Sequence, residues 1–145
     1  MHKITVALLE DLDACASQLE LFCKHYPQGV QRITVPTVFK ALRLGLDVSW
    51  LVEILMEDTG KHDPQFYTLA QELERELYRA CREINKEYHR RSDGIAFIPY
   101  LHERHRRWEE VDAWYVRETE PQRLVHYRKF APVLAAKLRE LLAQY

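Results

Sequence analysis

Glycine and proline are scarce in this sequence, which has four glycines and six prolines among 145 residues. Because these residues form turns and interrupt helices, their scarcity argues against a loop-rich fold. The longest apolar runs are far shorter than the ~20 residues that a membrane-spanning helix needs. The sequence also has no glycine-rich phosphate loop, nucleophile motif, internal repeat or low-complexity tract. These absences exclude membrane-spanning helical proteins and P-loop nucleotide-binding proteins.

Cysteine is also rare, with Cys15, Cys23 and Cys81 as its three examples. An odd number of cysteines without a CxxC pair does not suit a disulfide framework, so we expect reduced thiols. The N-terminus lacks the pattern of a signal peptide. Together with the short apolar runs, these features predict a soluble, cytoplasmic protein with no membrane partner.

Hydrophobic residues make up 47% of the sequence, which is enough to form one core. They recur at intervals of three and four residues, the spacing that places side chains on one face of a helix. The pattern predicts an all-α fold, a single-domain irregular bundle of about six helices over residues 1–145. Residues 1–60 are expected to form a unit of three short helices, packed on a long-helix bundle of residues 61–145.

The N-terminal unit is predicted from its capping and turn residues. Residues 4–9 are apolar and fit either a strand or an extended arm. The apolar spacing then predicts a first helix over residues 12–26 and a second over residues 35–44. Asp47 is expected to cap a third helix, and Gly60 follows the end of that helix.

The clearest helix start in the chain is at Asp63, a good N-cap that is followed by Pro64 in the first helical turn. This fourth helix is expected to run without a break to about Arg91. A turn at residues 92–94 then reverses the chain. Residues 98–115 form the expected fifth helix, so the fourth and fifth helices make a long helical hairpin.

Two prolines interrupt the C-terminal segment. Residues 119–121, which end in Pro121, are expected to restart the chain as a sixth helix. Pro132 lies inside that helix, where its missing N–H and the clash of its ring cost about 3 kcal/mol. We therefore expect a kink or break near residues 129–131.

A further pattern lies in the first 60 residues: an Ala-Cys pair, a phenylalanine one turn from a Pro-x-Gly stop, and the run Gly-Leu-Asp-Val-x-Trp-Leu. Its positions are Ala14, Cys15, Phe22, Pro27, Gly29, Gly45, Leu46, Asp47, Val48, Trp50 and Leu51. The pattern resembles a small helical module of uncharacterised bacterial and phage proteins. The matched segment is 60 of 145 residues, about 40% of the chain. The resemblance implies no established activity and no catalytic residues.

Basic residues concentrate between positions 75 and 107, where nine of the 21 lysines and arginines lie in a chain of net charge −1. At about 100° per residue, those of the fourth helix form a row on the side away from its apolar face. The candidate binding surface comprises Arg75, Arg79, Arg82, Lys86, Arg90, Arg104, Arg106, Arg107 and Tyr100. It could contact nucleic-acid phosphates or an acidic protein. Flanking glutamates are expected to neutralise part of the row, so a plain salt-bridged helix surface also fits.

A second candidate is a polar cluster of His102, His105, Glu109 and Asp112 on the fifth helix, with His126 on the next helix. The first four fall within about 80° of one another and overlap the apolar face, so they are expected to point inward. Such spacing lets imidazole and carboxylate groups converge on one metal ion. A hydrogen-bonded network between helices is the alternative. No HExxH motif is present and no cofactor is predicted, with a metal ion as the alternative.

A third candidate is the pair Arg82 and His89, whose spacing resembles the Arg-x4–6-His pattern of HEPN ribonucleases. That resemblance implies an arginine that stabilises phosphate charge and a histidine that acts as acid or base. Glu83 replaces the usual small polar residue of the pattern. Both side chains are also expected to project into the basic row rather than into a cleft.

These patterns favour a small, non-enzymatic protein-protein interaction protein, such as an inhibitor or adaptor of a phage or mobile element. No catalytic residue is predicted. A surface rich in arginine, tyrosine and tryptophan is typical of interface anchors, so a protein partner is expected. The alternatives are a nucleic-acid-binding protein that uses the basic surface, and a metal-dependent or HEPN-like hydrolase.

Overall fold

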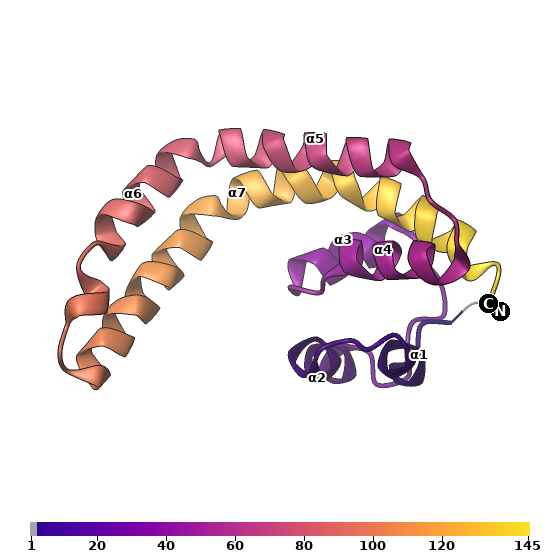
Figure 1. Cartoon of the computed structure of the whole chain (residues 1–145), viewed down its shortest axis with the longest axis horizontal. Coiled ribbons are helices and arrows are strands. Elements are labelled where there is room, and N and C mark those ends of the chain that lie inside the picture. The colour runs from indigo at the N-terminus through magenta and orange to yellow at the C-terminus, as the bar shows by residue number, and fades with distance from the viewer. Residues whose placement is uncertain (1–2) are drawn as a thin grey trace. The chain divides into compact units, whose positions relative to one another are not determined.

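The computed structural model describes residues 3–145, and over this range the chain is all-α, with no strand (Figure 1). The elements are α1 (Val6–Asp11), α2 (Ala16–His25), α3 (Val35–Arg43), α4 (Val48–Thr59), α5 (Pro64–Ala80), α6 (Arg82–Ser92), the 3₁₀ helix η1 (Ile95–Phe97) and α7 (Leu101–Leu142). The all-α prediction is therefore confirmed. In the described range, no helix combines the length and the apolar character that crossing a bilayer requires.

The chain divides into two compact units. The first contains residues 3–70 together with Tyr127–Tyr145, and the second is Gln71–His126. The prediction of a single domain with a boundary at residue 60 stays a prediction.

The N-terminal segment of the first unit is a helix where a strand or an extended arm was predicted. Thr5 caps α1, because its Oγ1 accepts a hydrogen bond from the Leu8 N–H at 3.1 Å. Extended pairing is confined to Ile4, which forms an isolated antiparallel bridge with Val30. The Ile4 N–H donates to the Val30 carbonyl at 3.0 Å, and the Val30 N–H donates back at 2.8 Å.

The next three helices of this unit begin and end at local capping signals. α2 starts at Ala16, four residues later than predicted, because Asp13 has a φ of 60° and ends the preceding helical segment. Asp47 caps α4 as predicted and accepts a hydrogen bond from the Trp50 N–H at 2.9 Å. Thr34 caps α3. Gly60 ends α4 in the left-handed conformation.

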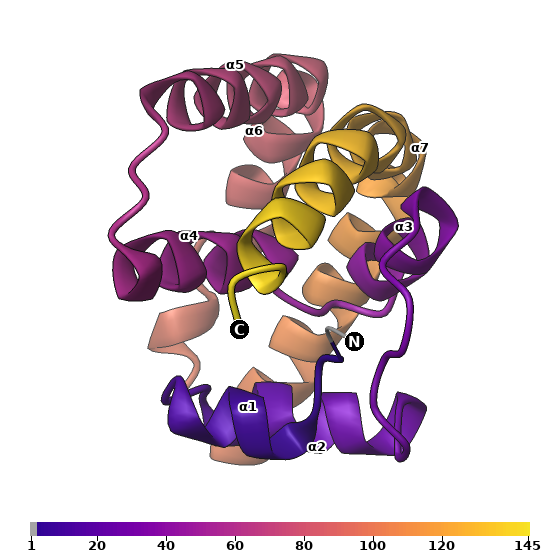
Figure 2. The same cartoon turned by 90° about the vertical axis from the view of Figure 1, so that its right-hand side faces the viewer.

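The core of the first unit joins α4 to the C-terminal end of α7, which Figure 2 shows against the N-terminal helices. The side chains with at most 1% exposure include Val52, Leu55, Met56, Leu134, Leu138, Leu141 and Leu142. At the edge of this core Lys137 of α7 forms an ion pair of 2.6 Å with Asp63, the N-cap of α5. The hydrogen bond from Lys137 lowers the pKa of the Asp63 carboxyl group.

The second unit is a helical hairpin, and its first arm is broken where the sequence predicts one continuous helix. α5 ends at Ala80, and Cys81, with φ −95° and ψ 5°, separates it from α6. The reason lies in contacts across the hairpin, which a single-helix pattern does not encode. Tyr115 of α7 donates to Asn85 at 2.8 Å, and the buried Cys81 side chain is 4% exposed.

The second arm, α7, is continuous through Pro121, so the predicted restart at this position is wrong. The missing proline N–H leaves one backbone bond unmade, but nearby side chains bond to the same turns. Thr119 Oγ1 donates to the Tyr115 carbonyl at 2.8 Å. Arg123 Nη2 donates to the Val116 carbonyl at 2.6 Å. These bonds support the helix on either side of the ring.

The helix also continues through Pro132, and the predicted break near residues 129–131 is absent from the described chain. Here burial offsets the cost of the proline. Phe130, Ala131 and Leu134 are between 0% and 3% exposed. Burial of a large apolar side chain such as Phe130 or Leu134 stabilises the fold by about 1.5–3 kcal/mol. This is comparable to the ~3 kcal/mol that an internal proline costs.

Candidate functional site

The basic row is divided into two parts by its glutamates. Arg75, Arg79 and Arg82 are exposed and make no ion pair in the described part of the chain. Further along α6, Lys86 pairs with Glu83 at 3.2 Å. Direct pairing with glutamates is therefore seen at the α6 end of the row.

Glu87 holds two arginines at that end. Arg90 donates to both oxygens of its carboxylate, at 2.8 and 2.6 Å, and Arg91 donates to Oε1 at 2.8 Å. The hydrogen bonds from Arg90 and then Arg91 lower the pKa of Glu87 to about 2. Arg91 also lies over the Trp114 ring, with its guanidinium carbon 4.1 Å from the ring centroid. Both arginines are therefore held in place on the surface.

The Glu87 contacts predict a pH dependence of stability. The folded pKa of Glu87 lies below its ordinary value of 4.5, so the stabilisation is fully present above pH 4.5 and is lost as pH falls toward 2. We expect Glu87→Gln to be less stable than wild type at pH 7, with most of the difference gone at pH 2, in urea unfolding at both pH values. Glu83→Gln, which breaks one exposed pair, is the control and should change stability less. An equal deficit of Glu87→Gln at both pH values would contradict this cause.

The polar cluster on α7 does not point inward as predicted. His102, His105, Glu109 and Asp112 are all exposed. The buried face of α7 is rotated about the helix axis relative to the face that the sequence predicted. It contains Val111, which is 9% exposed, and Tyr115, which bonds to α6, and the cluster lies beside it. Asp112 accepts a hydrogen bond from the Tyr88 hydroxyl at 3.2 Å. Among residues 3–145, no three His, Cys, Asp or Glu side chains are grouped so that they could hold a metal ion.

The Arg82 and His89 pair lies on the surface of α6. Both residues are exposed, and the His89 ring lies 5.9 Å from the Tyr88 ring. Neither residue lines either of the two cavities described below. The HEPN-like interpretation of this pair stays a prediction.

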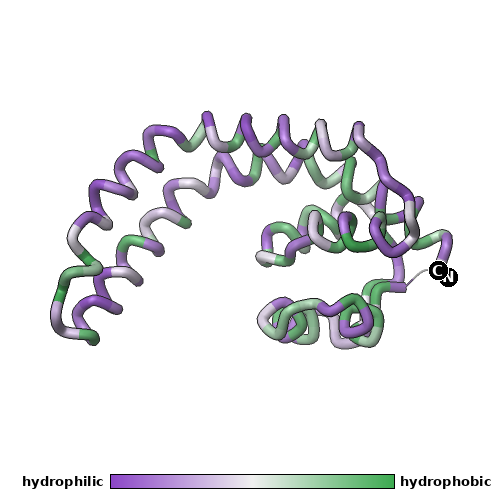
Figure 3. The backbone as a smooth tube through the Cα atoms, in the orientation of Figure 1, coloured by the Kyte–Doolittle hydropathy of each residue, from purple (hydrophilic) through white to green (hydrophobic). Residues whose placement is uncertain are grey.

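An exposed apolar cluster at the end of the hairpin is the feature that the sequence prediction missed. Phe97 is 88% exposed, Tyr100 71% and Leu101 59%, and we call these three residues the tip patch. Figure 3 shows hydrophobic residues in this connection between α6 and α7. Only Tyr100 belonged to the predicted surface. The signal that could have found the others is the apolar run that directly follows the turn at Gly94.

The first turns of α7 place arginines beside the tip patch. Arg104, Arg106 and Arg107 make no ion pair in the described chain, and residues 97–107 contain three arginines against one glutamate. The guanidinium groups are therefore available to a partner. The hairpin end combines exposed aromatic surface with positive charge.

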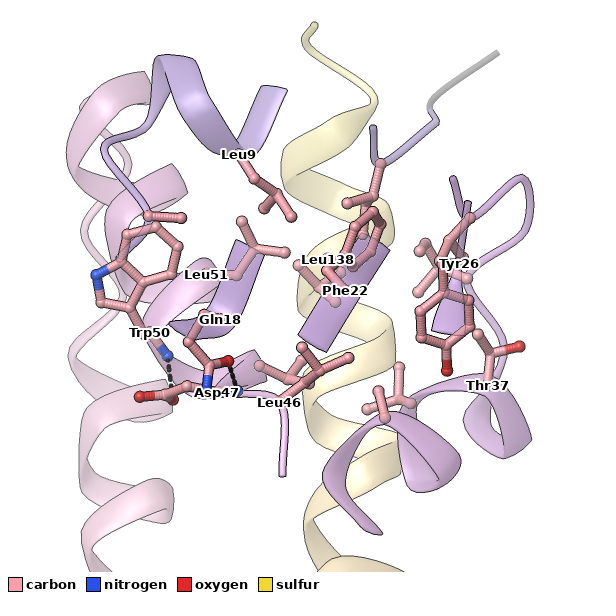
Figure 4. Close-up of a pocket in the computed structure, with 17 residues that line it drawn as sticks. Leu9, Gln18, Phe22, Tyr26, Thr37, Leu46, Asp47, Trp50, Leu51 and Leu138 are labelled. Carbon is pink, nitrogen blue, oxygen red and sulfur yellow. Dashed lines mark hydrogen bonds between the residues drawn. The ribbon is translucent and has the colours of Figure 1, made fainter. Parts of the chain in front are cut away.

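A small cavity lies inside the first unit and is shown in Figure 4. Its volume is about 70 Å³, and its wall is mostly apolar, with Leu9, Phe22, Leu51 and Leu138 around it. The Tyr26 hydroxyl is buried and makes no hydrogen bond, and burial raises its pKa. This volume is several-fold smaller than the range of about 300–1,000 Å³ of small-molecule sites, so we interpret the space as a packing void.

A larger groove lies on the hairpin, between α5, α6 and α7 of the second unit. Its volume is about 410 Å³. The hydrogen-bonded pair Tyr115 and Asn85 lines one part of it, and burial raises the pKa of the Tyr115 hydroxyl. Arg123 lies in the same groove. None of these groove residues belongs to the predicted site, because their proximity depends on how α6 pairs with α7.

The tip patch, its arginines and the groove are the features from which a function can be argued. The resemblance of residues 1–60 to a phage module stays a prediction. Comparisons of the chain with protein-family models, curated proteins and solved structures find no match.

Proposed function

We propose that the protein is a non-enzymatic interaction protein whose hairpin tip binds an acidic surface of a protein partner. The observation that supports this function most is the tip patch, where three large apolar side chains are more than half exposed within five residues. Contiguous exposed apolar surface with a polar rim is typical of interaction sites. An inhibitor or adaptor would use such a surface without catalytic chemistry.

The composition of the tip patch suits an interface anchor. Aromatic side chains bury a large area with little loss of rotamer freedom, and they dominate the energetics of many interfaces. Phe97 contributes little to the fold at 88% exposure, whereas the adjacent Ile95 is 2% exposed and anchors the turn. Burial of a side chain such as Phe97 on binding stabilises a complex by about 1.5–3 kcal/mol. The turn is thus held from inside while its outer side chains remain available.

The charge around the tip patch selects the kind of partner. Arg104, Arg106 and Arg107 have no carboxylate of this chain within ion-pair distance in the described residues. Acidic groups on a partner would supply the missing counter-charges, and opposite surface potentials accelerate association. The partner surface is therefore acidic at its rim and apolar at its centre.

The test replaces the two aromatic anchors. We expect the double variant Phe97→Ser/Tyr100→Ser to bind the partner at least about 30-fold more weakly. Loss of one anchor of about 2 kcal/mol already gives this factor, and additive loss of both gives about 1,000-fold. The measurement is mass spectrometry of co-purifying proteins from the native host, followed by calorimetry with the purified partner. Val125→Ser is the matched control, because Val125 is 50% exposed on the same helix but lies outside the tip patch.

The same measurement separates the alternatives. If the double variant and Val125→Ser recover the same proteins as wild type, the tip is not the interface and the proposal fails. Recovery of nucleic acid instead of protein, with a steep loss of affinity in rising salt, would assign the unpaired Arg75, Arg79 and Arg82 to phosphate contacts. We expect the double variant to remain folded, because both replaced side chains are exposed.

A further inference from the structure

The hairpin groove has the size and the apolar wall of a small-ligand site. Its volume of about 410 Å³ falls in the range of about 300–1,000 Å³ that such sites occupy. Leu77 and Tyr78 of α5 and Val116 of α7 form apolar parts of its lining. Tyr78 is 65% exposed and Val116 is 55% exposed, so neither is used by the fold as core.

Arg123 is held inside this groove by two hydrogen bonds to its own helix. Its Nε donates to Thr119 Oγ1 at 3.1 Å, and its Nη2 donates to the Val116 carbonyl at 2.6 Å. Thr119 is 2% exposed and donates its own proton to the Tyr115 carbonyl, which orients its oxygen to accept from Arg123. The guanidinium group therefore lies back along α7, beside Val116, instead of extending into solvent.

The guanidinium group lacks a counter-charge. No carboxylate of the described chain lies within ion-pair distance of Arg123, although Glu74 lines the same groove. A guanidinium group carries five N–H donors, and the two bonds to Thr119 and Val116 leave Nη1 without an acceptor among residues 3–145. Arginine pairs best with carboxylates, to which it can donate two parallel hydrogen bonds.

From these contacts we infer that the groove binds a small monocarboxylate with an apolar body, whose carboxylate pairs with Arg123 and whose body lies on Tyr78, Leu77 and Val116. At about 30 Å³ per non-hydrogen atom the groove accommodates roughly a dozen such atoms. Glu74 adds one negative charge to the lining, so a dianion such as a phosphate monoester is disfavoured. This site is separate from the tip patch and does not depend on it.

The first test uses decanoate as the probe and decanol as its uncharged counterpart, in titration calorimetry with the full chain. Wild type is expected to bind decanoate with a saturable 1:1 stoichiometry. Arg123→Gln should weaken decanoate binding about tenfold or more, because a charge-assisted pair is lost, and should leave decanol binding unchanged. Tyr78→Ala should weaken both ligands, and decyl phosphate should bind wild type more weakly than decanoate.

A second variant keeps the test decisive if Arg123→Gln disturbs folding. Val116→Glu places a carboxylate next to the guanidinium group, at a position that is 55% exposed, and should abolish decanoate binding through internal pairing. Val125→Glu adds the same charge to the same helix outside the groove and should bind decanoate as wild type does. Absence of saturable decanoate binding to wild type, or equal loss in the two glutamate variants, would overturn the inference. Loss of the tip interface alone would leave these results unchanged.

Discussion

Replacing Gly29 with alanine is expected to lower the free energy of unfolding by about 3 kcal/mol or more. Gly29 has a φ of +73°, which costs an L-residue about 1–2 kcal/mol. An added Cβ would also lie 2.5 Å from the Ile4 carbonyl oxygen, which is a backbone atom and cannot rotate away. That oxygen accepts the Val30 N–H, so the methyl group forces apart the bridge that holds the N-terminal segment. Each lost hydrogen bond adds about 0.5–1.5 kcal/mol.

The matched control for Gly29→Ala is Gly60→Ala. Gly60 has a similar φ of +67°, but nothing lies within 4 Å of its added Cβ. Gly60→Ala should therefore lower the free energy of unfolding only by the backbone cost of a positive φ, about 1–2 kcal/mol. Urea unfolding of both variants measures the difference, which isolates the collision with Ile4. Equal losses in the two variants would show that the bridge at Ile4 contributes nothing to stability.

Leu138→Ala is expected to destabilise the first unit by about 2–5 kcal/mol, the range for a buried leucine. Leu138 is 1% exposed and lines the 70 Å³ cavity between the N-terminal helices and α7. Removing its side chain enlarges a space that already exists, and the helices on its sides prevent full collapse. The cost should therefore lie in the upper half of that range.

Leu101→Ala is the control for this substitution, since Leu101 lies on the same helix but is 59% exposed. Its effect on stability should remain within about 0.5 kcal/mol, as for most surface positions. Thermal and urea unfolding at pH 7 provide the measurement. A loss below about 1 kcal/mol for Leu138→Ala would mean that the cavity collapses around the smaller side chain.

Helix starts were the most predictable part of this fold. Asp47 and Asp63 carry their capping information within three residues, and both accept the expected backbone hydrogen bonds in the structure. Such signals depend on local geometry, so neighbouring helices do not alter them.

Helix interruptions depended on tertiary contacts and were mispredicted in both directions. Pro121 predicts a helix end, yet α7 continues because Thr119 and Arg123 bond to the adjacent turns. The sequence around Cys81 contains no helix-breaking residue, yet the helix is interrupted there, where α6 pairs with α7. Propensity is a local quantity, and contacts between helices override it.

The candidate site was predictable only in part for the same reason. The arginines of the basic row are exposed, but the exact face of α7 decides whether His105 points inward, and a small rotation reversed that expectation. The tip patch follows from a turn that leaves Phe97 outside and Ile95 inside. The groove around Arg123 requires the register of α6 against α7, which no pattern in either helix specifies.

The first unit is built from both ends of the chain. The ribosome synthesises its central leucines, Leu134, Leu138 and Leu141, only after all of residues 71–126. Helices α1–α4 therefore leave the ribosome without the segment that completes their core, whereas the hairpin contains only neighbouring sequence. Contacts between distant segments slow folding. The order of synthesis thus favours folding of the hairpin first, with closure of the N-terminal unit as the final step.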